Sequence, residues 1–488
     1  MSLVDIEAIV FAPLALLVYW LLPARRTTQN AWLLLCSYAF YASWSIELLG
    51  LLVAGTLLDF SAGRYLAATA SREDAATARR RRVVLFCSLG FSLGALAYFK
   101  YRGFFAHALN DLLAGFNLSA HSSILQLALP LGISFYTLQR VGYILDVFWG
   151  RHHGCRSLLD FTLFTSYFPQ ITAGPISRAA ELLPQLEQAR RWSLNQLTMG
   201  AKEFLLGYAL KAWAGNTIGQ QIVDPVFSAS GSYDVFAHWL AIFGYAAQVF
   251  CDFAGYSLIA IGLSRSFGIV LPQNFNYPFL SRSLPELWRR WHITLNRWLF
   301  DYIFTPLTTS RGWFRNRLDL ALLLTFLASG LWHGANWTFV IWGALHGVGM
   351  AMQRNWDERY RSRSRTDRSL ISMRRSVGYT VAAWALTQLF FVVTLVPFRS
   401  PDFDTASAFL VYLGSSPGTQ SVPVGVNAGL AFLFLIAWHL LKVPRIAELR
   451  QRIATLPDAV RGFAYGGAIV FLYLQTPPGS GAFIYQQF

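Results

Sequence analysis

Charged residues are scarce in this 488-residue chain. They make up 13% of it, against about 25% in an average soluble domain. Hydrophobic residues make up 55% and include 39 Phe and 17 Trp. A soluble protein of this length could not remove so much apolar surface from water. The composition therefore excludes an ordinary soluble enzyme and predicts an integral membrane protein with many spans.

Cysteine motifs are also absent. The four cysteines are scattered and lie mostly within apolar runs, at Cys36, Cys87, Cys155 and Cys251. They form no Cys-x-x-Cys pair and no Cys/His spacing typical of metal ligands. The sequence therefore indicates neither a disulfide framework nor a zinc site, and we expect no bound metal and no bound cofactor.

A cleavable leader is not expected either. Residues Met1–Glu7 are acidic rather than basic, and the apolar stretch that follows lacks a small-residue cleavage site. This start predicts a first transmembrane helix rather than a removable signal peptide.

Basic residues outnumber acidic ones, and the net charge is +15. They cluster between apolar segments instead of covering a soluble face, which argues against nucleic acid as a partner. The positive-inside rule assigns such clusters to cytoplasmic loops. We therefore predict a plasma-membrane protein, in bacteria the inner membrane, with both termini extracytoplasmic. The clusters are Arg25-Arg26, Arg72–Arg82, Arg151–Arg156, Arg354–Arg375 and Lys442–Arg452.

Twelve apolar stretches are candidates for membrane-spanning helices, which need about 20 mostly apolar residues. Several are short, so tilted, re-entrant or fused helices are expected among them. They are Ile6–Leu22, Ala31–Trp44, Ile46–Phe60, Val83–Phe99, Ile124–Phe148, Gly200–Ala214, Phe236–Leu263, Leu318–Leu331, Trp337–Met352, Val377–Val396, Val426–Leu441 and Phe463–Leu474.

Two regions do not fit simple spans. Phe161–Trp192 contains helix-breaking Pro and Gly residues, and Phe267–Arg317 mixes aromatics with arginines that are too polar to face lipid. Irregular backbone at membrane depth survives where it is buried in protein or lines a cavity. We predict re-entrant or cavity-lining segments; for Phe267–Arg317, amphipathic helices on the cytoplasmic surface are the alternative. No internal repeat is visible, and we predict one domain over residues 1–488.

His333 lies between two almost entirely apolar stretches, in the run Leu331–Trp337. A charged side chain at membrane depth costs at least about 2.5 kcal/mol, which makes such residues functional candidates. A neutral, packed and hydrogen-bonded histidine is the alternative. Trp332 directly precedes His333 and is placed in the same site.

A second histidine, His292, stands in the run Trp288–Trp298. On a helix, Trp288, His292 and Asn296 share one face. Burial among indoles favours the neutral imidazole, the form that a general base needs. Arg290 lies in the same run and is expected to line the site. An interfacial belt of aromatic residues is the alternative.

The surroundings of His333 suggest acyl transfer. Gly334 would let a substrate approach the backbone closely, and a backbone N–H with the Asn336 amide would stabilise an oxyanion. No Gly-x-Ser-x-Gly elbow is evident, so a substrate hydroxyl could attack a thioester directly while histidine takes the proton. Asp252 lies within an apolar span, where it could orient a histidine or form a structural ion pair with a buried arginine. We interpret His346 as structural.

Several runs together resemble the membrane-bound O-acyltransferase (MBOAT) superfamily, in particular the bacterial polysaccharide O-acetyltransferases of the alginate type. They are Leu129–Thr137, Ala173–Pro175, Asp252–Ser257, Asn274–Asn276, Trp288–Trp298 with Asp301-Tyr302, Leu331–Trp337 and the terminal Phe483–Phe488. Leu258, Phe300, Gln170 and Gln486 depart from that branch's usual residues and leave the polymer open.

By this resemblance, His333 matches the catalytic histidine of the superfamily and His292 its second characteristic histidine. The resemblance implies a ring of about 11–12 transmembrane helices around a central tunnel. It also implies transfer of an acetyl group from a cytoplasmic donor such as acetyl-CoA to an exported polysaccharide, for example alginate, cellulose or peptidoglycan. A periplasmic partner of the SGNH-hydrolase type would complete the transfer in some systems. The alternatives are D-alanyl transfer to teichoic acid from a carrier-protein thioester, and a transporter for a polysaccharide precursor.

Overall fold

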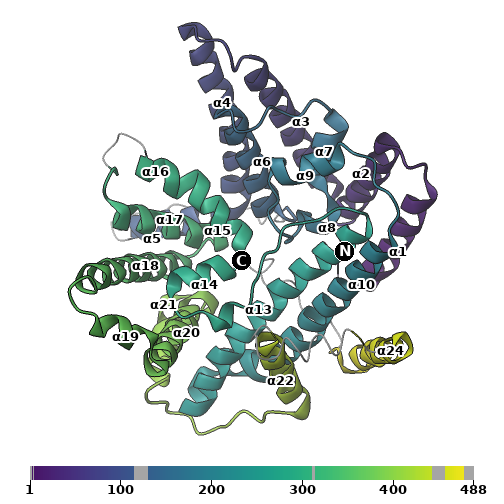
Figure 1. Cartoon of the computed structure of the whole chain (residues 1–488). Coiled ribbons are helices and arrows are strands. Elements are labelled where there is room, and N and C mark those ends of the chain that lie inside the picture. Colours follow the sequence, from purple (N-terminus) through teal and green to yellow (C-terminus); the bar gives the residue numbers. More distant parts are fainter. Residues whose placement is uncertain are drawn as a thin grey trace. The chain divides into compact units, whose positions relative to one another are not determined.

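The computed structural model describes residues 3, 5–114, 130–309, 314–441, 455 and 457–477. These residues form helices joined by turns and loops (Figure 1), with one isolated parallel bridge between Tyr233 and Gln420. The predicted all-α class is confirmed. The chain divides into two compact units, Met1–Phe204 with Tyr256–Gln273, and Leu205–Gly255 with Asn274–Phe488. That the whole chain acts as one domain stays a prediction.

The first unit is built from long apolar helices and several short ones. Its elements are α1 (Ile6–Leu21), α2 (Arg26–Ala42), α3 (Ile46–Ala68), α4 (Ala75–Leu96), the π-helical η1 (Ala97–Tyr101), α5 (Arg102–Ala114), α6 (Ile133–Phe148), α7 (Leu158–Ser166), α8 (Phe168–Ile171) and α9 (Ala179–Leu186). Helices α10 (Leu194–Tyr208) and α13 (Val235–Ser266) each contribute residues to both units.

The second unit alternates long helices with short, interrupted ones. It contains η2 (Ala209–Gly215), α11 (Asn216–Ile218), η3 (Gly219–Val223), α12 (Asp224–Ser228), η4 (Ser230–Ser232), η5 (Pro278–Leu280), α14 (Leu284–Arg290), α15 (Ile293–Leu299), η6 (Phe300–Phe304), α16 (Thr305–Thr309), α17 (Leu318–His333), α18 (Trp337–Arg363), α19 (Ser369–Arg375), α20 (Val377–Arg399), α21 (Phe403–Tyr412), α22 (Val426–Leu440) and α24 (Asp458–Gln475).

Where the structure describes them, the twelve predicted spans fall largely on helical residues. Four helical stretches are long and apolar enough to cross a membrane, Ile46–Ala68, Ala75–Asn110, Val235–Ser266 and Val377–Arg399, and four shorter helices are apolar as well. The chain is therefore a multi-pass membrane protein. Residues 124–129 of one predicted span, the whole basic cluster Lys442–Arg452 and the terminal run Phe483–Phe488 lie outside the described residues.

The two irregular regions consist of short helices, and their re-entrant or cavity-lining role stays a prediction. Residues 161–192 form the short helices α7, α8 and α9, and residues 267–317 form η5, α14, α15, η6 and α16. Much of both regions is buried within the protein. Among the helices of the described residues that no predicted span or irregular region covers are α5, α12, α19 and α21. Helix α18 also extends to Arg363, beyond the predicted end at Met352, because its last turns carry a spaced ion pair, Arg354 with Glu358.

A buried ion pair joins the helices of the first unit. Helices α3, α4 and α6 lie side by side (Figure 1). Arg140 Nε lies 2.6 Å from Asp59 Oδ2, and both side chains are almost fully buried. Ser88 Oγ donates a second hydrogen bond to Asp59 at 2.5 Å. Gly55 leaves room for the guanidinium, because a Cβ there would stand within 2.5 Å of it. Helices α3, α4 and α6 thus contribute Asp59, Ser88 and Arg140 to one buried hydrogen-bonded group.

Close glycine contacts set the position of α17 against α18. A Cβ on Gly330 would stand 2.3 Å from the Phe339 carbonyl oxygen, and one on Gly343 would stand 2.4 Å from the Phe326 carbonyl oxygen. Small residues let transmembrane helices approach in this way. The hairpin formed by α17 and α18 therefore holds His333, the last residue of α17, close to the first turns of α18.

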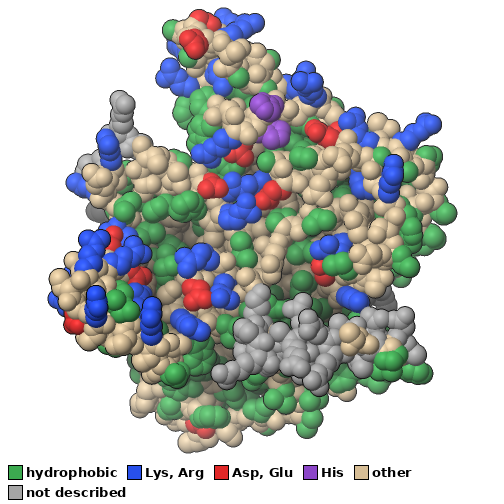
Figure 2. Space-filling view, viewed as in Figure 1, with side chains coloured by type: hydrophobic (Ala, Val, Ile, Leu, Met, Phe, Trp, Pro, Cys, Tyr) green, Lys and Arg blue, Asp and Glu red, His purple; other side chains and the backbone are tan. Residues whose placement is uncertain are grey.

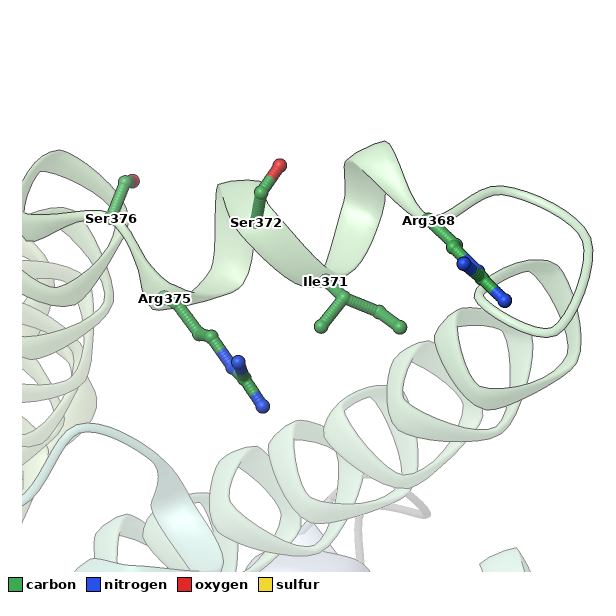
Figure 3. Close-up of a pocket in the computed structure, with 5 residues that line it drawn as sticks. All are labelled: Arg368, Ile371, Ser372, Arg375 and Ser376. Atoms are coloured by element: carbon green, nitrogen blue, oxygen red, sulfur yellow. The ribbon is translucent and has the colours of Figure 1, made fainter.

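Helices α18 and α20 run antiparallel. Asn336, just before α18, contacts Pro401, just after α20, and further along His346 contacts Thr394. Arginine side chains gather over α18 and α19 (Figure 2). Arg368 and Arg375 point to the same side of α19, on either side of Ile371 (Figure 3), where they line a cavity of about 400 Å³. The arginine-rich residues 354–375, called the basic segment below, therefore lie at the N-terminal end of α20.

We expect Arg140→Met to lower the free energy of unfolding by about 3–5 kcal/mol, because it leaves the Asp59 carboxylate buried without its cation. Asp59→Leu combined with Arg140→Met should regain most of that loss, since it removes both charges. Unfolding of the purified protein in detergent measures both changes. Equal instability of the single and double variants would contradict the account.

Candidate functional site

His292 lies in a break between two short helices. Helix α14 ends at Arg290 and α15 begins at Ile293, and His292 takes a left-handed backbone conformation with φ 44° and ψ 53°. The prediction that Trp288, His292 and Asn296 share the face of one helix is therefore wrong. Such a conformation costs a non-glycine residue about 1–3 kcal/mol, and strain of this kind clusters at functional sites.

Side chains satisfy the backbone groups that this break releases. Asn296 Nδ2 donates to the carbonyl oxygens of Trp291 at 2.7 Å and His292 at 3.1 Å. The Ile293 amide donates to the Asn274 carbonyl oxygen at 2.8 Å. Free backbone polar groups away from water must find partners within the protein. Asn296, predicted to face the substrate, thus supports the turn that carries His292.

Arg290 also supports the turn. Its NH2 lies 2.7 Å from Glu286 Oε1, and its NH1 donates to the Asn276 carbonyl oxygen at 3.3 Å. The Asn276 amide in turn donates to the Arg290 carbonyl oxygen at 2.8 Å. Arg290 therefore ties α14 to the segment that precedes it.

Asn274 fixes the proton on the His292 ring. Its Oδ1 accepts from the Thr294 amide at 3.2 Å and from Thr294 Oγ1 at 2.9 Å, and it lies 3.1 Å from His292 Nδ1. An atom that accepts from a backbone amide is the amide oxygen, so Nδ1 of His292 donates to it. The neutral ring then carries its lone pair on Nε2. That atom is buried and has no hydrogen-bond partner among the described residues.

The two candidate histidines share one indole. The ring centroid of Trp332 lies 5.8 Å from that of His292 and 5.0 Å from that of His333. The His333 ring also contacts Trp342 at 5.0 Å and Phe398 at 5.2 Å. Both histidines are at least 96% buried. The structure thus brings together the two histidines and Trp332, which the sequence had placed in one site.

Gly334 and Asn336 both contact other residues of the protein. A Cβ on Gly334 would stand 2.0 Å from the Phe339 ring. Asn336 caps α18, since its Oδ1 accepts from the Thr338 amide at 3.1 Å, and its Nδ2 donates to the Pro401 carbonyl oxygen at 2.5 Å. The geometry gives both residues a positioning role beside His333. The oxyanion contacts expected of them stay predictions.

Trp288 packs among the aromatic residues around His346. Its ring contacts His346 at 5.0 Å and Phe326 at 5.2 Å. His346 is fully buried, and its Nε2 lies 3.0 Å from Thr394 Oγ1. This contact matches the structural interpretation of His346.

A cavity of about 510 Å³ opens beside Trp288 and Asn296. Aromatic and aliphatic side chains line most of it, which is usual for sites that bind small molecules. The remaining lining residues are Pro285, Arg289, Ile293, Arg297, Leu299, Phe300, Asp301, Phe304, Leu322, Thr325, Phe326 and Met350.

Asp252 forms a buried ion pair with Lys211 of η2. A Cβ on Gly255 would stand 2.7 Å from the Lys211 amide nitrogen, so α13 and η2 are in close contact here. Phe253, next to Asp252, places its ring 4.4 Å from the His292 ring. Asp252 therefore anchors the part of α13 that packs against His292, in agreement with the ion-pair interpretation.

Two residues of the site were not predicted from the sequence. Asn274 and Phe253 touch His292 directly, yet they were noted only as parts of matching runs. The repeated Asn in Asn274–Asn276 was the available signal, because a buried Asn that neighbours a helix break commonly bonds to backbone.

We expect Asn274→Leu to reduce acyl transfer by about 10- to 100-fold, since a nearly isosteric side chain would no longer fix the His292 tautomer. Asn276→Leu is the matched control, because the described contacts of Asn276 use its backbone. Transfer of labelled acetyl by purified protein measures both. Equal losses in the two variants would contradict the assigned role of Asn274.

Gly334→Ala should abolish most of the activity, because the new methyl group overlaps the Phe339 ring. If Gly334 acts through packing, Gly334→Ala with Phe339→Ala restores transfer. Continued inactivity of a folded double variant would instead favour the close approach of substrate to this glycine. Activity and thermal unfolding, measured on the same preparations, separate the two roles.

Comparison with known proteins adds independent evidence. Residues 151–396 match the membrane-bound O-acyltransferase family (MBOAT), a range that contains His292, His333 and most of their neighbours. A probable alginate O-acetylase of Azotobacter vinelandii is 37% identical over 400 residues, which cover 81% of this chain and 74% of the relative.

Two further relatives carry other names. The peptidoglycan O-acetyltransferase of Helicobacter pylori is 32% identical, over 81% of this chain and 76% of its own. The teichoic acid D-alanyltransferase of Bacillus subtilis is 30% identical, over 47% of this chain and 61% of its own. The chain belongs to the membrane-bound O-acyltransferase family and is a multi-pass membrane enzyme that transfers acyl groups to oxygen.

Proposed function

We propose that this enzyme O-acetylates an exported cell-surface polysaccharide, taking the acetyl group from acetyl-CoA on the cytoplasmic side. The similarity to alginate and peptidoglycan O-acetyltransferases supports the acetyl group and the class of acceptor. The pair of buried histidines around Trp332 carries the proposal, because it supplies a proton acceptor that is protected from water.

In the proposed reaction, the oxygen of the acceptor hydroxyl attacks the thioester carbonyl, and His333 accepts the proton of that hydroxyl. The acyl–sulfur bond breaks as the acyl–oxygen bond forms, and the proton passes from the imidazole to the departing thiolate. His292, held as the Nδ1–H tautomer by Asn274, presents Nε2 as a second acceptor. General-base catalysis contributes about 10²–10⁴-fold, and holding both reactants in place contributes further.

The basic segment at residues 354–375 supports the orientation of the proposal. Six of its arginines are exposed and form no ion pair among the described residues: Arg359, Arg361, Arg363, Arg365, Arg368 and Arg375. Such segments stay on the cytoplasmic side. Helix α20 begins directly after this segment, and its 23 residues span about 34 Å at 1.5 Å per residue. Residue 399 then lies near the extracytoplasmic face of the inner membrane, where polymer or an SGNH-type partner would receive acetyl.

D-alanyl transfer from a carrier protein is the second candidate, favoured by the relative from Bacillus subtilis. The donor distinguishes the two. Membranes that hold the protein should transfer label from acetyl-CoA without a carrier protein, whereas dependence on a D-alanylated carrier would overturn the acetyl donor. Membership in an acyltransferase family sets aside the transporter alternative.

His333→Ala should remove nearly all ester-linked acetate from the exported polysaccharide, because the proposed base is lost. The measurement is acetate released by mild alkali from a deletion strain complemented with wild type or variant. His346→Gln is the matched control, since it alters another buried histidine of the same aromatic cluster and keeps a hydrogen-bonding side chain for Thr394. Full acetylation with membrane-inserted His333→Ala protein would refute the catalytic assignment.

A further inference from the structure

A second cavity, of about 560 Å³, lies at the C-terminal end of α20. Polar and apolar side chains line it together, and they come from η3, α12, the residues around the end of α20, and α21. The lining residues are Gln220, Asp224, Pro225, Phe227, Ser228, Arg399, Pro401 and Thr405. Neither the sequence motifs nor the histidine cluster accounts for this cavity.

The cavity lies next to the histidine site. Phe398, the neighbour of Arg399, places its ring 5.2 Å from that of His333. Pro401, which lines the cavity, accepts a hydrogen bond from the Asn336 amide. The basic segment adjoins the opposite end of α20. Given the proposed function, on which this inference rests, the cavity is on the acceptor side of the membrane.

Its two charged lining residues neutralise each other. Arg399 NH2 lies 3.0 Å from Asp224 Oδ1, and the side chains remain 29% and 47% exposed. The guanidinium carbon also stands 5.9 Å from the Phe227 ring centroid and 5.8 Å from that of Tyr245. The arginine is thus held in place, while both charged groups stay accessible to a solute that enters the cavity.

We propose that this cavity binds the acceptor sugar and selects a neutral, hydroxyl-rich sugar over a uronic acid. Sugar hydroxyls donate to Asp224 and accept from Arg399 without disturbing the pair, and Gln220, Ser228 and Thr405 offer further hydrogen bonds. A uronate carboxylate would have to approach Arg399 beside the Asp224 carboxylate. Like charges brought together in this way discriminate against the wrong ligand.

The experiment compares two acceptors with the full-length enzyme in lipid nanodiscs, using labelled acetyl-CoA as donor. Cello-oligosaccharides provide neutral sugars, and oligomannuronates of equal length provide uronates. For the wild type we expect kcat/KM to be at least tenfold higher with the neutral acceptor. Asp224→Asn leaves Arg399 without its anion and should shift the preference at least tenfold toward the uronate.

Two more variants complete the design. Arg399→Gln leaves Asp224 unpaired and should shift the preference further toward the neutral sugar, opposite to Asp224→Asn. Asp404→Asn is the matched control, because Asp404 is exposed on α21 and does not line the cavity, so its preference should equal that of the wild type. Binding of labelled acetyl-CoA to each variant, measured in the absence of sugar, reports that the protein is folded and binds its donor.

The outcomes separate this inference from the proposed function. A wild type that acetylates uronates better, or a preference unchanged in Asp224→Asn and Arg399→Gln, would overturn the cavity assignment and leave acetyl transfer intact. Acetylation of a protein partner alone, with neither oligosaccharide accepted, would overturn it as well. Failure to use acetyl-CoA with any acceptor would instead overturn the proposed function, and this inference with it.

Discussion

The structure of the candidate site depends on satisfying a broken backbone away from water. The interruption between α14 and α15 frees carbonyl and amide groups, and each unpaired group in an apolar environment would cost several kcal/mol. Asn274 and Asn296 provide partners for these groups. The same contacts fix the backbone and the ring of His292. A single requirement, that no backbone group be left unpaired, therefore also determines which nitrogen of this histidine can accept a proton.

Aromatic packing joins this turn to the α17–α18 hairpin. Trp332 contacts both candidate histidines, and Trp342 contacts both His333 and His346. Rigid rings with few rotatable bonds keep the imidazoles in place at small entropic cost. The glycine contacts between α17 and α18 let the two helices approach closely, which brings the rings that these helices carry into contact. Apolar contacts thus fix the positions of the histidine rings, and Asn274 fixes the tautomer of His292.

Much of this arrangement could be predicted from the sequence. Long apolar runs with polar ends, such as Val377–Val396, predict helices because length and hydropathy suffice, and His333 and His292 stood out because ionisable groups are rare in such surroundings. The left-handed residue at His292 could not be predicted. Its neighbours Trp291 and Ile293 favour no turn, and the break depends on Asn274, eighteen residues earlier. The packing roles of Gly334 and Asn336 likewise depend on Phe339 and Pro401, whose proximity is tertiary.

The short run from Phe398 to Pro401 has a thermodynamic consequence. One of its residues touches His333, another touches Asn336, and Arg399 between them lines the cavity at the C-terminal end of α20. A bound molecule that shifts Arg399 therefore also changes the contacts of Phe398 and Pro401 with the histidine site. Binding at the cavity and binding at the histidine site are then thermodynamically linked. Linkage is reciprocal, so a donor that reorients His333 changes the affinity for the acceptor by the same factor. In such an enzyme, binding of one substrate changes the affinity for the other through the four residues Phe398–Pro401 at the end of α20.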